Sequence, residues 1–280
     1  MKLRIMSNNQ WKNDENTPYW EERGLDCSAA VREKGFAEIY RRFAPDIIGL
    51  QEVSALMVDY LMRNLQELGL PFALVWGRDT PILYRRDKLE LVDSDFLVYP
   101  RSVPGLDGEY NNNDTKSYAV AVFRSKENDK LLGLMSTHLW WKSDDPSVPH
   151  YQAGSGLARA YQIGIAIDRL NALSADYPIP QIILGDFNTP YASDPIDMAF
   201  SKGFVHAHDV AVEYRAESNG WHPCGPTILG PYNPSSFDKA IDHILVRNAP
   251  EGFVRRFERE MPDDYLVLSD HAPVWIDVEL

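Results

Sequence analysis

QIILGDFNTP, residues Gln181–Pro190, is an apolar run that stops abruptly at a glycine and continues in polar residues. Its first part, Gln181–Leu184, is β-branched and apolar, which predicts a short strand buried on both faces. Asp186 and Asn188 follow at the end of this strand. Because they lie two positions apart, an extended chain would point both side chains to the same side. They could position a water and hold an oxyanion, although the same residue types also form ordinary turns.

The composition limits what the protein can bind. The 280 residues include 28 basic and 41 acidic side chains, which gives a net charge of −13. A hydrophobic fraction of 44% with 25% charged residues is typical of a globular protein. Nucleic-acid binding draws much of its affinity from Lys and Arg. A broad basic surface is therefore disfavoured, whereas an acidic protein suits a site that recruits divalent cations.

The termini and the cysteines do not identify the cellular compartment of the protein. No apolar run approaches the roughly 20 residues that a membrane span needs. The start, MKLRIMSNNQ, has no signal-peptide core. We expect a soluble protein, cytoplasmic if the chain is complete and exported if a leader was removed. Cys27 and Cys224 could form a disulfide in an oxidising compartment or remain free thiols. The oligomeric state is left open.

Strands and helices alternate along the chain without a convincing linker, which favours one domain over residues 1–280 with a mixed α/β sandwich fold. The other predicted strands are Leu3–Asn9, Asp46–Val53, Phe72–Trp76, Pro81–Tyr84, Leu89–Tyr99, Tyr118–Arg124, Leu131–His138, Ile241–Val246 and Pro273–Val278. Helices are predicted over Ala29–Phe43, after Ser54, over Leu157–Leu173 with Leu157 facing inward, and from Asp194. The loops expected to set specificity are Pro100–Thr115, Trp140–Gly156 and Asn219–Ser236.

Six apolar runs end or begin with polar residues that can bind metals or move protons. These residues are Asn9, Glu52, His138, Asp186 with Asn188, Asp242 with His243, and Asp270 with His271. Each one alone has an ordinary structural interpretation, such as a solvated strand end or a helix cap. Their recurrence at six strand ends favours a functional site.

The residue types in this set point to metal-assisted chemistry. The oxygen ligands Glu52 and Asp270, with Asn9, suit Mg²⁺ or Mn²⁺ better than zinc. Histidines beside such an ion can contact phosphate oxygens or transfer protons near neutral pH. An acid beside a histidine fixes its tautomer. Together these features predict attack of water on phosphorus.

The motifs LRIMSNN, IIGLQEV, STHL, ILGDFNT, AIDHILV and SDHAPV resemble those of the endonuclease/exonuclease/phosphatase superfamily. The resemblance runs from Leu3 to Val274 in the family's order. It implies a four-layer α/β/β/α sandwich, in which helices flank two packed mixed β-sheets and the site lies at one end. It also implies a phosphoesterase that depends on Mg²⁺ or Mn²⁺.

The resemblance assigns expected roles to the site residues. Glu52 would be the principal metal ligand, with Asn9 beside it on metal or phosphate. Asp186 would orient or deprotonate the attacking water, and Asn188 would bind the phosphate. Asp270 would be a second acid at the metal.

The remaining roles fall to histidines and their neighbours. His271 would contact the scissile phosphate, oriented by Asp242. His138 would bind phosphate or assist the leaving group. His243 stands where the family often has tyrosine, and we expect it to pack. Tyr118 could correspond to an aromatic residue that lies beside the phosphate in some members, but the sequence does not fix the alignment at this position.

Several further features have ordinary explanations. The segment His206-Ala-His208-Asp209 lacks a third zinc ligand at a useful spacing, so we interpret it as a polar strand edge. Trp140 and Trp141 could stack on a base or sugar or pack beneath their loop. Arg159 and Gln162 match a recurring Arg-x-x-Gln of the family, and we expect them to tie their helix to the sheet.

The leading hypothesis is hydrolysis of a small phosphoester such as a sugar, lipid headgroup or nucleotide ester. A nuclease is the alternative, and it would need a basic groove. Arg23, Lys142 and Arg215 are too scattered in sequence to establish one. A non-catalytic binding module on the same fold is the alternative of a different class.

Overall fold

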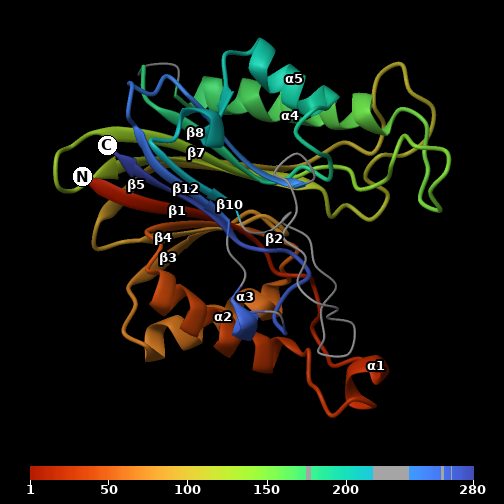
Figure 1. Ribbon diagram of the computed structural model, residues 1–280, viewed down its shortest axis with the longest axis horizontal. Helices are drawn as coiled ribbons and strands as arrows, with labels where there is room; N and C mark the ends of the chain where they lie inside the picture. Colours follow the sequence, from red (N-terminus) through yellow and green to blue (C-terminus); the bar gives the residue numbers. More distant parts are fainter. Residues whose placement is uncertain (175–177, 217–239, 260–261, 266) are drawn as a thin grey trace.

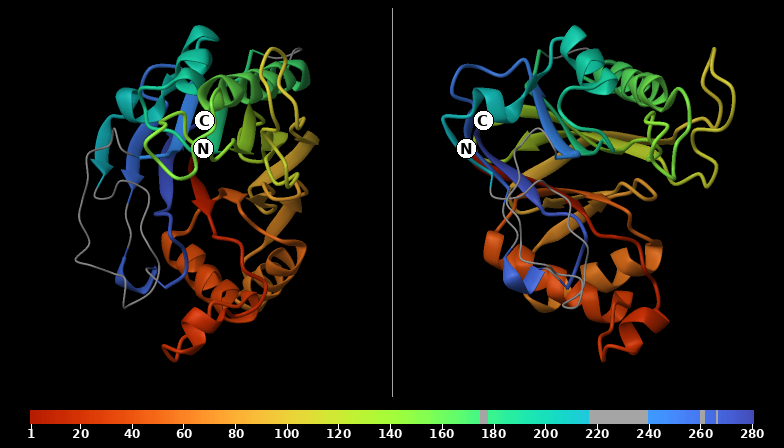
Figure 2. Two further views of the ribbon diagram at one scale, coloured as in Figure 1. Left: turned by 90° about the vertical axis from the view of Figure 1, so that its right-hand side faces the viewer. Right: turned by 45° about the vertical axis from the view of Figure 1, so that its right-hand side comes forward.

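Two mixed β-sheets pack against each other in the computed structural model, which describes residues 1–174, 178–216, 240–259, 262–265 and 267–280. Helices α2 (Ala29–Phe43) and α3 (Ala55–Glu67) cover the outer face of one sheet (Figure 1). Helices α4 (Ser155–Leu173) and α5 (Asp194–Ser201) cover the other. The rotated views in Figure 2 separate the layers. The predicted four-layer sandwich is confirmed.

The larger sheet has the strand order β10-β12-β13-β1-β2-β4-β3. Its strands are β10 (Glu213–Ala216), β12 (Val254–Arg259), β13 (Val274–Glu279), β1 (Lys2–Asn9), β2 (Ile47–Gln51), β4 (Ile82–Arg85) and β3 (Phe72–Val75). β1 is parallel to β2 and antiparallel to β13. β1 and β2 therefore end at the same edge of the sheet.

The smaller sheet has the order β5-β6-β7-β8-β11-β9. Its strands are β5 (Leu89–Val98), β6 (Ser117–Ser125), β7 (Leu131–His138), β8 (Gln181–Asp186), β11 (Asp242–Arg247) and β9 (Val205–His206). β7 and β8 run parallel, whereas β6 and β11 run antiparallel to them. The ends of β7 and β8 thus meet the starts of β6 and β11.

Some expectations need correction. The sequence did not predict the short helix α1 (Pro18–Glu21) or the strands β10 and β12, whereas the polar strand edge expected at His206 is present as β9. Leu157 is 58% exposed and does not face inward.

Cys27 is buried near Trp20, and both Cys224 and the loop Asn219–Ser236 lie outside the described residues. No helix in the described ranges is long and apolar enough to cross a bilayer.

Two glycines allow close approaches that a side chain would block, one between the sheets and one within the smaller sheet. A Cβ atom on Gly49 of β2 would lie 2.1 Å from Leu184 Cδ1 of β8, across the interface between the sheets. A Cβ atom on Gly185 would lie 1.9 Å from the carbonyl oxygen of Thr137 on the neighbouring strand. Gly185 also has φ +150°, which other residues rarely adopt. This glycine lets β8 pair closely with β7 just before Asp186.

We predict that Gly185→Ala destabilises the fold by about 3 kcal/mol or more, because the new methyl group must push the Thr137 backbone away. Gly164→Ala is the control: no atom lies within 4 Å of a Cβ at that helical position. Removing a helical glycine should stabilise by about 1 kcal/mol. Urea unfolding of both variants tests this. Equal stability of the two variants would contradict the proposed close approach.

Candidate active site

Four neighbouring strands place polar residues in one row across the smaller sheet. In the strand register Ser117 of β6 is paired with His138 of β7, His138 with Asp186 of β8, and Asp186 with Asp242 of β11. The row forms because β7 and β8 are parallel and end together, while β11 begins opposite them. It lies at the far end of the sheets from the N and C labels in Figure 1.

The larger sheet delivers the other predicted residues to the same end. Asn9 closes β1, and Glu52 follows directly after the parallel strand β2. Glu52 leaves the strand with φ 54°, in the left-handed region. Asp270 and His271 precede β13, which pairs with β1. The structure thus brings the predicted residues of both sheets together.

Asp186 lies at the centre of the site and receives contacts from both sheets. Asn9 Nδ2 donates to its Oδ2 at 3.1 Å, and the backbone N–H of Asn188 donates to Oδ1 at 2.8 Å. His138 Nε2 and His271 Nε2 lie 3.4 and 3.9 Å from Oδ2. Burial raises the pKa of Asp186 to about 7, although the nearby His271 opposes the shift. A carboxyl group with this pKa can exchange a proton near neutral pH.

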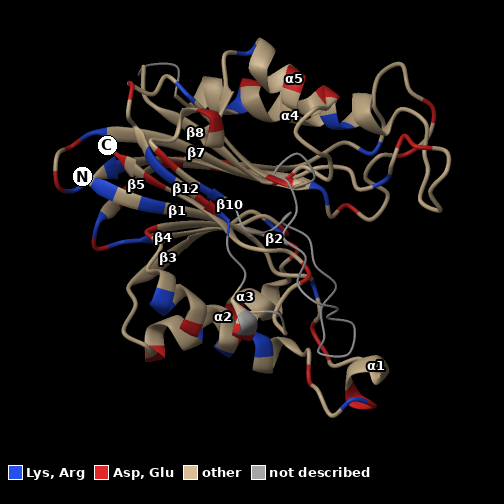
Figure 3. Cartoon of the chain, in the orientation of Figure 1, with Lys and Arg blue, Asp and Glu red and all other residues tan. Residues whose placement is uncertain are grey.

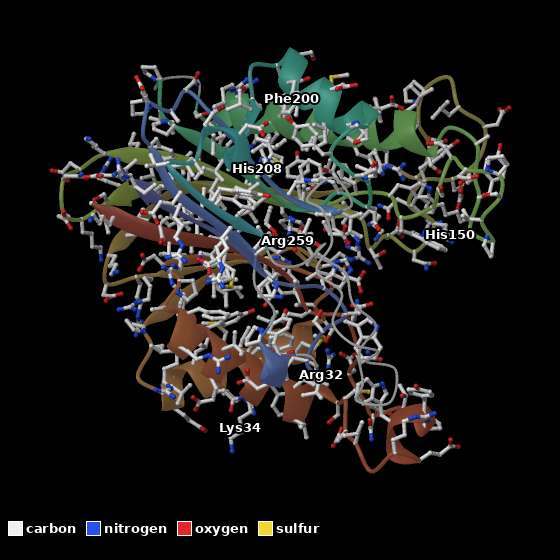
Figure 4. The ribbon with its side chains drawn as sticks, in the orientation of Figure 1. Arg32, Lys34, His150, Phe200, His208 and Arg259 are labelled. Atoms are coloured by element: carbon white, nitrogen blue, oxygen red, sulfur yellow. The ribbon has the colours of Figure 1, made fainter. Side chains whose placement is uncertain are left out.

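His271 and Asp242 form a buried ion pair. His271 Nδ1 lies 2.8 Å from Asp242 Oδ2, so Nδ1–H donates to the carboxylate and Nε2 faces Asp186. Burial alone would lower the pKa of His271, but Asp242 and then Asp186 raise it well above its usual value. Arg259, near the centre of Figure 4, donates from Nη2 to the Asp242 carbonyl oxygen at 2.6 Å. The imidazole is therefore charged and held in one orientation.

Lys116 is a site residue that the sequence analysis missed. It is buried, and its Nζ contacts both ring nitrogens of His138, with Nδ1 at 3.3 Å and Nε2 closer. Burial, followed by the charges of Lys116 and His271, lowers the pKa of His138 well below its usual value. Glu52 Oε1 lies 3.7 Å from His138 Nε2. Only the antiparallel pairing of β6 with β7 could have revealed that Lys116 reaches this position.

Asn188 does not continue the strand, so the expectation of an extended chain through Asp186 and Asn188 is wrong. β8 ends at Asp186, and Asn188 has a left-handed φ of 52°. Its backbone bond to Asp186 closes a turn, and its Nδ2 donates to the Leu139 carbonyl oxygen at 3.1 Å. The turn fixes the amide beside the carboxylate and ties it to the loop after β7.

The acids of the site suit a hard divalent cation. Asp270 Oδ1 is buried without a hydrogen-bond partner among the described residues. Burial raises the pKa of Asp270, and the negative charge of Glu52 adds to this shift. A cation facing both acids would satisfy the unpaired oxygen and remove the repulsion. At the same place Asn9 Oδ1 accepts from the Trp11 backbone N–H at 2.9 Å, and Asn9 Nδ2 donates to Asp186.

Two groups of side chains place their ligand atoms close enough to share an ion. Glu52, His138 and Asp186 each offer one atom within 4.8 Å of the others. Asp186, Asp242 and His271 form a second group of this kind. The charged His271 is a poor metal ligand, because a metal needs a neutral imidazole nitrogen. A cation is therefore better placed at Glu52 of the first group, whose negative charge also acts on Asp270.

The neighbouring histidines form a neutral chain of hydrogen bonds. The His208 backbone N–H donates to His206 Nδ1 at 3.2 Å, so the proton of His206 is on Nε2, which lies 3.1 Å from His243 Nδ1. His243 Nε2 then donates to the Thr189 carbonyl oxygen at 2.8 Å. Burial lowers the pKa of His243 to about 3. His243 therefore forms a hydrogen bond to the loop after β8, in addition to the packing that we expected.

The two tryptophans after β7 differ in environment. Trp140 is buried against Tyr110. Trp141 is 45% exposed, and its ring stacks on His150, which Figure 4 labels, with the ring centroids 5.7 Å apart. Lys142 Nζ lies 5.9 Å from the Trp141 ring centroid. Trp140 packs beneath its loop, whereas Trp141 offers a ring to solvent.

Other side chains brace this loop or lie away from the site. Arg159 Nη1 donates to the carbonyl oxygens of Trp140 and Lys142. Gln162 accepts from the Trp140 backbone N–H at 2.9 Å. Both therefore hold the loop after β7. Tyr118 is buried against Tyr99 in the core beneath α4, so it does not line the phosphate side of the site.

We predict that Asp242→Asn lowers the pKa of His271, because the variant removes the carboxylate that stabilises the imidazolium. In the wild type the raised pKa of His271 stabilises the folded state. This contribution is fully present below about pH 6.5, the pKa of histidine in the unfolded chain, and is lost as the pH rises through the pKa of His271 in the folded protein. The variant should lose this pH dependence. NMR titration of the imidazole protons without added metal measures the pKa, and Asp59→Asn on α3 is the control. An unchanged His271 titration would show that the pair does not hold the charge.

We also predict that Glu52→Gln weakens Mn²⁺ binding by about tenfold or more, because it removes a carboxylate ligand. Calorimetric titration with Mn²⁺ measures the affinity. Glu67→Gln, an exposed position at the end of α3, should bind as the wild type does. Equal affinity of all three proteins would place the ion elsewhere.

The fold and sequence are similar to those of known proteins. A structure from Bacteroides thetaiotaomicron described as an endonuclease/exonuclease/phosphatase family protein aligns with 99% of this chain and 98% of its own, at 18% identity and a TM-score of 0.73. A mannosyl-6-phosphatase from the same organism aligns over 99% and 100% at 18% identity, with a TM-score of 0.72. D. rerio TDP2, solved with a single-strand DNA product, aligns over 100% and 99% at 16% identity, with a TM-score of 0.63.

Identities this low show the fold alone. No curated protein sequence matches the chain significantly. The sequence profile of the endonuclease/exonuclease/phosphatase family does match, over residues 27–271. Members of this family are phosphoester hydrolases that typically depend on a divalent metal. The chain therefore belongs to the endonuclease/exonuclease/phosphatase family and is a hydrolase of phosphoric ester bonds.

Proposed function

We propose that the protein hydrolyses a small phosphoester by direct attack of water on phosphorus, with Mg²⁺ or Mn²⁺ as the cofactor. The observation that carries the proposal is the position of Asp186 between His138 and His271, with Asn9 and Asn188 holding its two oxygens. A buried carboxyl group that is oriented from two sides and bordered by two imidazoles is suited to proton transfer.

In this mechanism Asp186 orients the attacking water and accepts its proton. Its pKa of about 7 lets the group act as a base near neutral pH and release the proton afterwards. Asn9 keeps the carboxylate in place from the opposite sheet, because its Nδ2 donates to Oδ2. Asn9 thus orients the carboxylate, and the second lone pair of its Oδ1 would be available to metal or phosphate.

The histidines and Asn188 hold the phosphoryl group. His271, charged and oriented by Asp242, donates from Nε2 to a phosphate oxygen and stabilises the negative charge of the transition state. His138, which is neutral and buried, binds the phosphate or assists departure of the leaving group. Asn188 has one amide N–H left for the phosphate after its bond to Leu139.

The cofactor would be held by Glu52 and Asp270, with Asn9 alongside. When bound, such an ion polarises a phosphoryl oxygen and lowers the pKa of its water. Hard oxygen donors favour Mg²⁺ or Mn²⁺ over zinc. The unpaired Asp270 Oδ1 supports this assignment.

Charge and rim residues support a small substrate. The net charge is −13, and the Lys and Arg residues in Figure 3 are spread over the described elements without forming a stripe. Trp141, two residues beyond the contact between Leu139 and Asn188, could stack on a sugar or base. The similar fold of a mannosyl-6-phosphatase fits this substrate class.

A nuclease is the second candidate, and a solved TDP2 complex with single-strand DNA product has the same fold. A long nucleic acid would need cations along its backbone. Arg23 instead lies over Tyr19, with 3.6 Å to the ring centroid. Lys142 is followed closely in the sequence by the exposed acids Asp144 and Asp145. A binding module without chemistry would not need a proton-exchanging carboxyl group, so we place it last.

The test compares hydrolysis of a chromogenic phosphomonoester and a chromogenic phosphodiester with Mg²⁺, with Mn²⁺ and with excess chelator. We predict that activity needs metal and falls by roughly two orders of magnitude or more in Asp186→Ala and His271→Ala. Asp168→Ala, on the exposed side of α4, should retain full activity. Failure of the wild type to bind metal or to hydrolyse either ester would refute the enzymatic proposal and favour the binding module.

A further inference from the structure

Lys116 is a buried lysine whose side-chain hydrogen bonds, among the described residues, all go to His138 of the site. It is only 5% exposed, and its Nζ contacts the ring nitrogens of His138. No carboxylate oxygen of the described residues lies within 4.0 Å of Lys116 Nζ, which is the distance limit for an ion pair. A buried lysine normally has such a partner, because an uncompensated charge is costly to bury. The fold alone therefore does not explain this side chain.

The hydrogen-bonding capacity of Lys116 is largely unused. An ammonium group carries three N–H donors and no acceptor. Neutral His138 offers one nitrogen with a free lone pair, so two donors of Lys116 remain without an acceptor among the described residues. Burial lowers the pKa of Lys116, and the charges of Glu52, Asp186 and Asp79 oppose this shift. These acids, which Lys116 does not contact directly, thus favour the charged form of the amine against the effect of burial.

The backbone of Lys116 is fixed before any ligand arrives. Buried Asn111 accepts from the Lys116 backbone N–H at 2.9 Å and donates to the Lys116 carbonyl oxygen at 2.9 Å. Its Nδ2 also donates to the Tyr99 carbonyl oxygen at 2.7 Å. Ser117, the next residue, pairs in register with His138. These contacts hold the side chain at the row of site residues, as a preorganised ligand contact requires.

We propose that Lys116 is a further catalytic residue, which donates its two unused N–H bonds to oxygens of the scissile phosphoryl group. The proposal rests on the proposed function, because it assumes that a phosphoryl group binds beside Asp186. Lys116, just before β6, and His271, just before β13, would then provide positive charge from the two sheets, one through Nζ and one through Nε2. The amine acts as a point charge with rotatable donors, which suits a tetrahedral group.

The experiment measures the binding of inorganic phosphate by calorimetry at saturating Mn²⁺. Lys116→Met keeps the length of the side chain but removes every donor, and we expect phosphate affinity to fall by about ten- to a hundredfold. Lys116→Arg keeps donors and charge and should stay within roughly fivefold of the wild type. Lys130→Met, an exposed lysine before β7, is the matched control and should change nothing.

Two further measurements separate this role from others. Mn²⁺ affinity is measured for each variant by electron paramagnetic resonance. Tighter Mn²⁺ binding in Lys116→Met with unchanged phosphate affinity would overturn the proposal and leave Lys116 as a charge that offsets the acids. A lower thermal midpoint with unchanged phosphate affinity would overturn it in favour of a structural role. If Lys116→Met does not fold, Lys116→Gln, which retains a donor for His138, replaces it under the same criteria.

The outcomes also separate this proposal from the proposed function. Phosphate binding that depends on Lys116, in a protein that hydrolyses neither chromogenic ester, would support Lys116 as a phosphoryl ligand and overturn the proposed hydrolysis of small esters. Hydrolysis by the wild type with phosphate affinity unaffected by Lys116→Met would overturn the Lys116 proposal alone. A wild type that does not bind phosphate at saturating Mn²⁺ would overturn the Lys116 proposal as well.

Discussion

The hydrogen bond between Asn9 and Asp186 is the contact on which the geometry of the site depends. It joins β1 of one sheet to β8 of the other, and both partners are buried. Because a buried carboxyl group is costly without donors, the two sheets must keep their relative position for Asp186 to be satisfied. The bond from Gln51 to Ser136 repeats this link between the sheets one layer deeper. Proton transfer and sheet packing therefore share the same polar contacts.

The strand ends could be predicted from the sequence, because an apolar run that stops at a polar residue is a local signal. Strands that pair in parallel must then bring residues such as His138 and Asp186 to one edge. Contacts that depend on strand order could not be predicted in this way. Lys116 meets His138 through pairing of β6 with β7, and the left-handed turn at Asn188 follows from its bonds to Asp186 and Leu139.

The missed strands have a related cause. β12 is VRRFER, in which charged residues outnumber apolar ones, and its inward positions are recognisable only once β13 is its neighbour. The site also contains conformations that local rules disfavour, since Glu52 and Asn188 both have positive φ. Such backbone strain persists only where the surrounding structure enforces it, and it is frequent at functional sites. Two of the departures from simple sequence rules thus lie at the candidate site.

The histidine chain from His208 through His206 to His243 runs in one direction, from a backbone donor to the Thr189 carbonyl acceptor. The rings of His206 and His243 each accept on Nδ1 and donate from Nε2. Replacing either ring by a side chain with a different pattern of donors and acceptors would therefore leave the other ring without its hydrogen-bond partner. Substitutions at positions 206 and 243 should therefore be coupled during evolution. Relatives with tyrosine at position 243 are expected to differ at position 206 as well, and such paired changes would mark one lineage within the family.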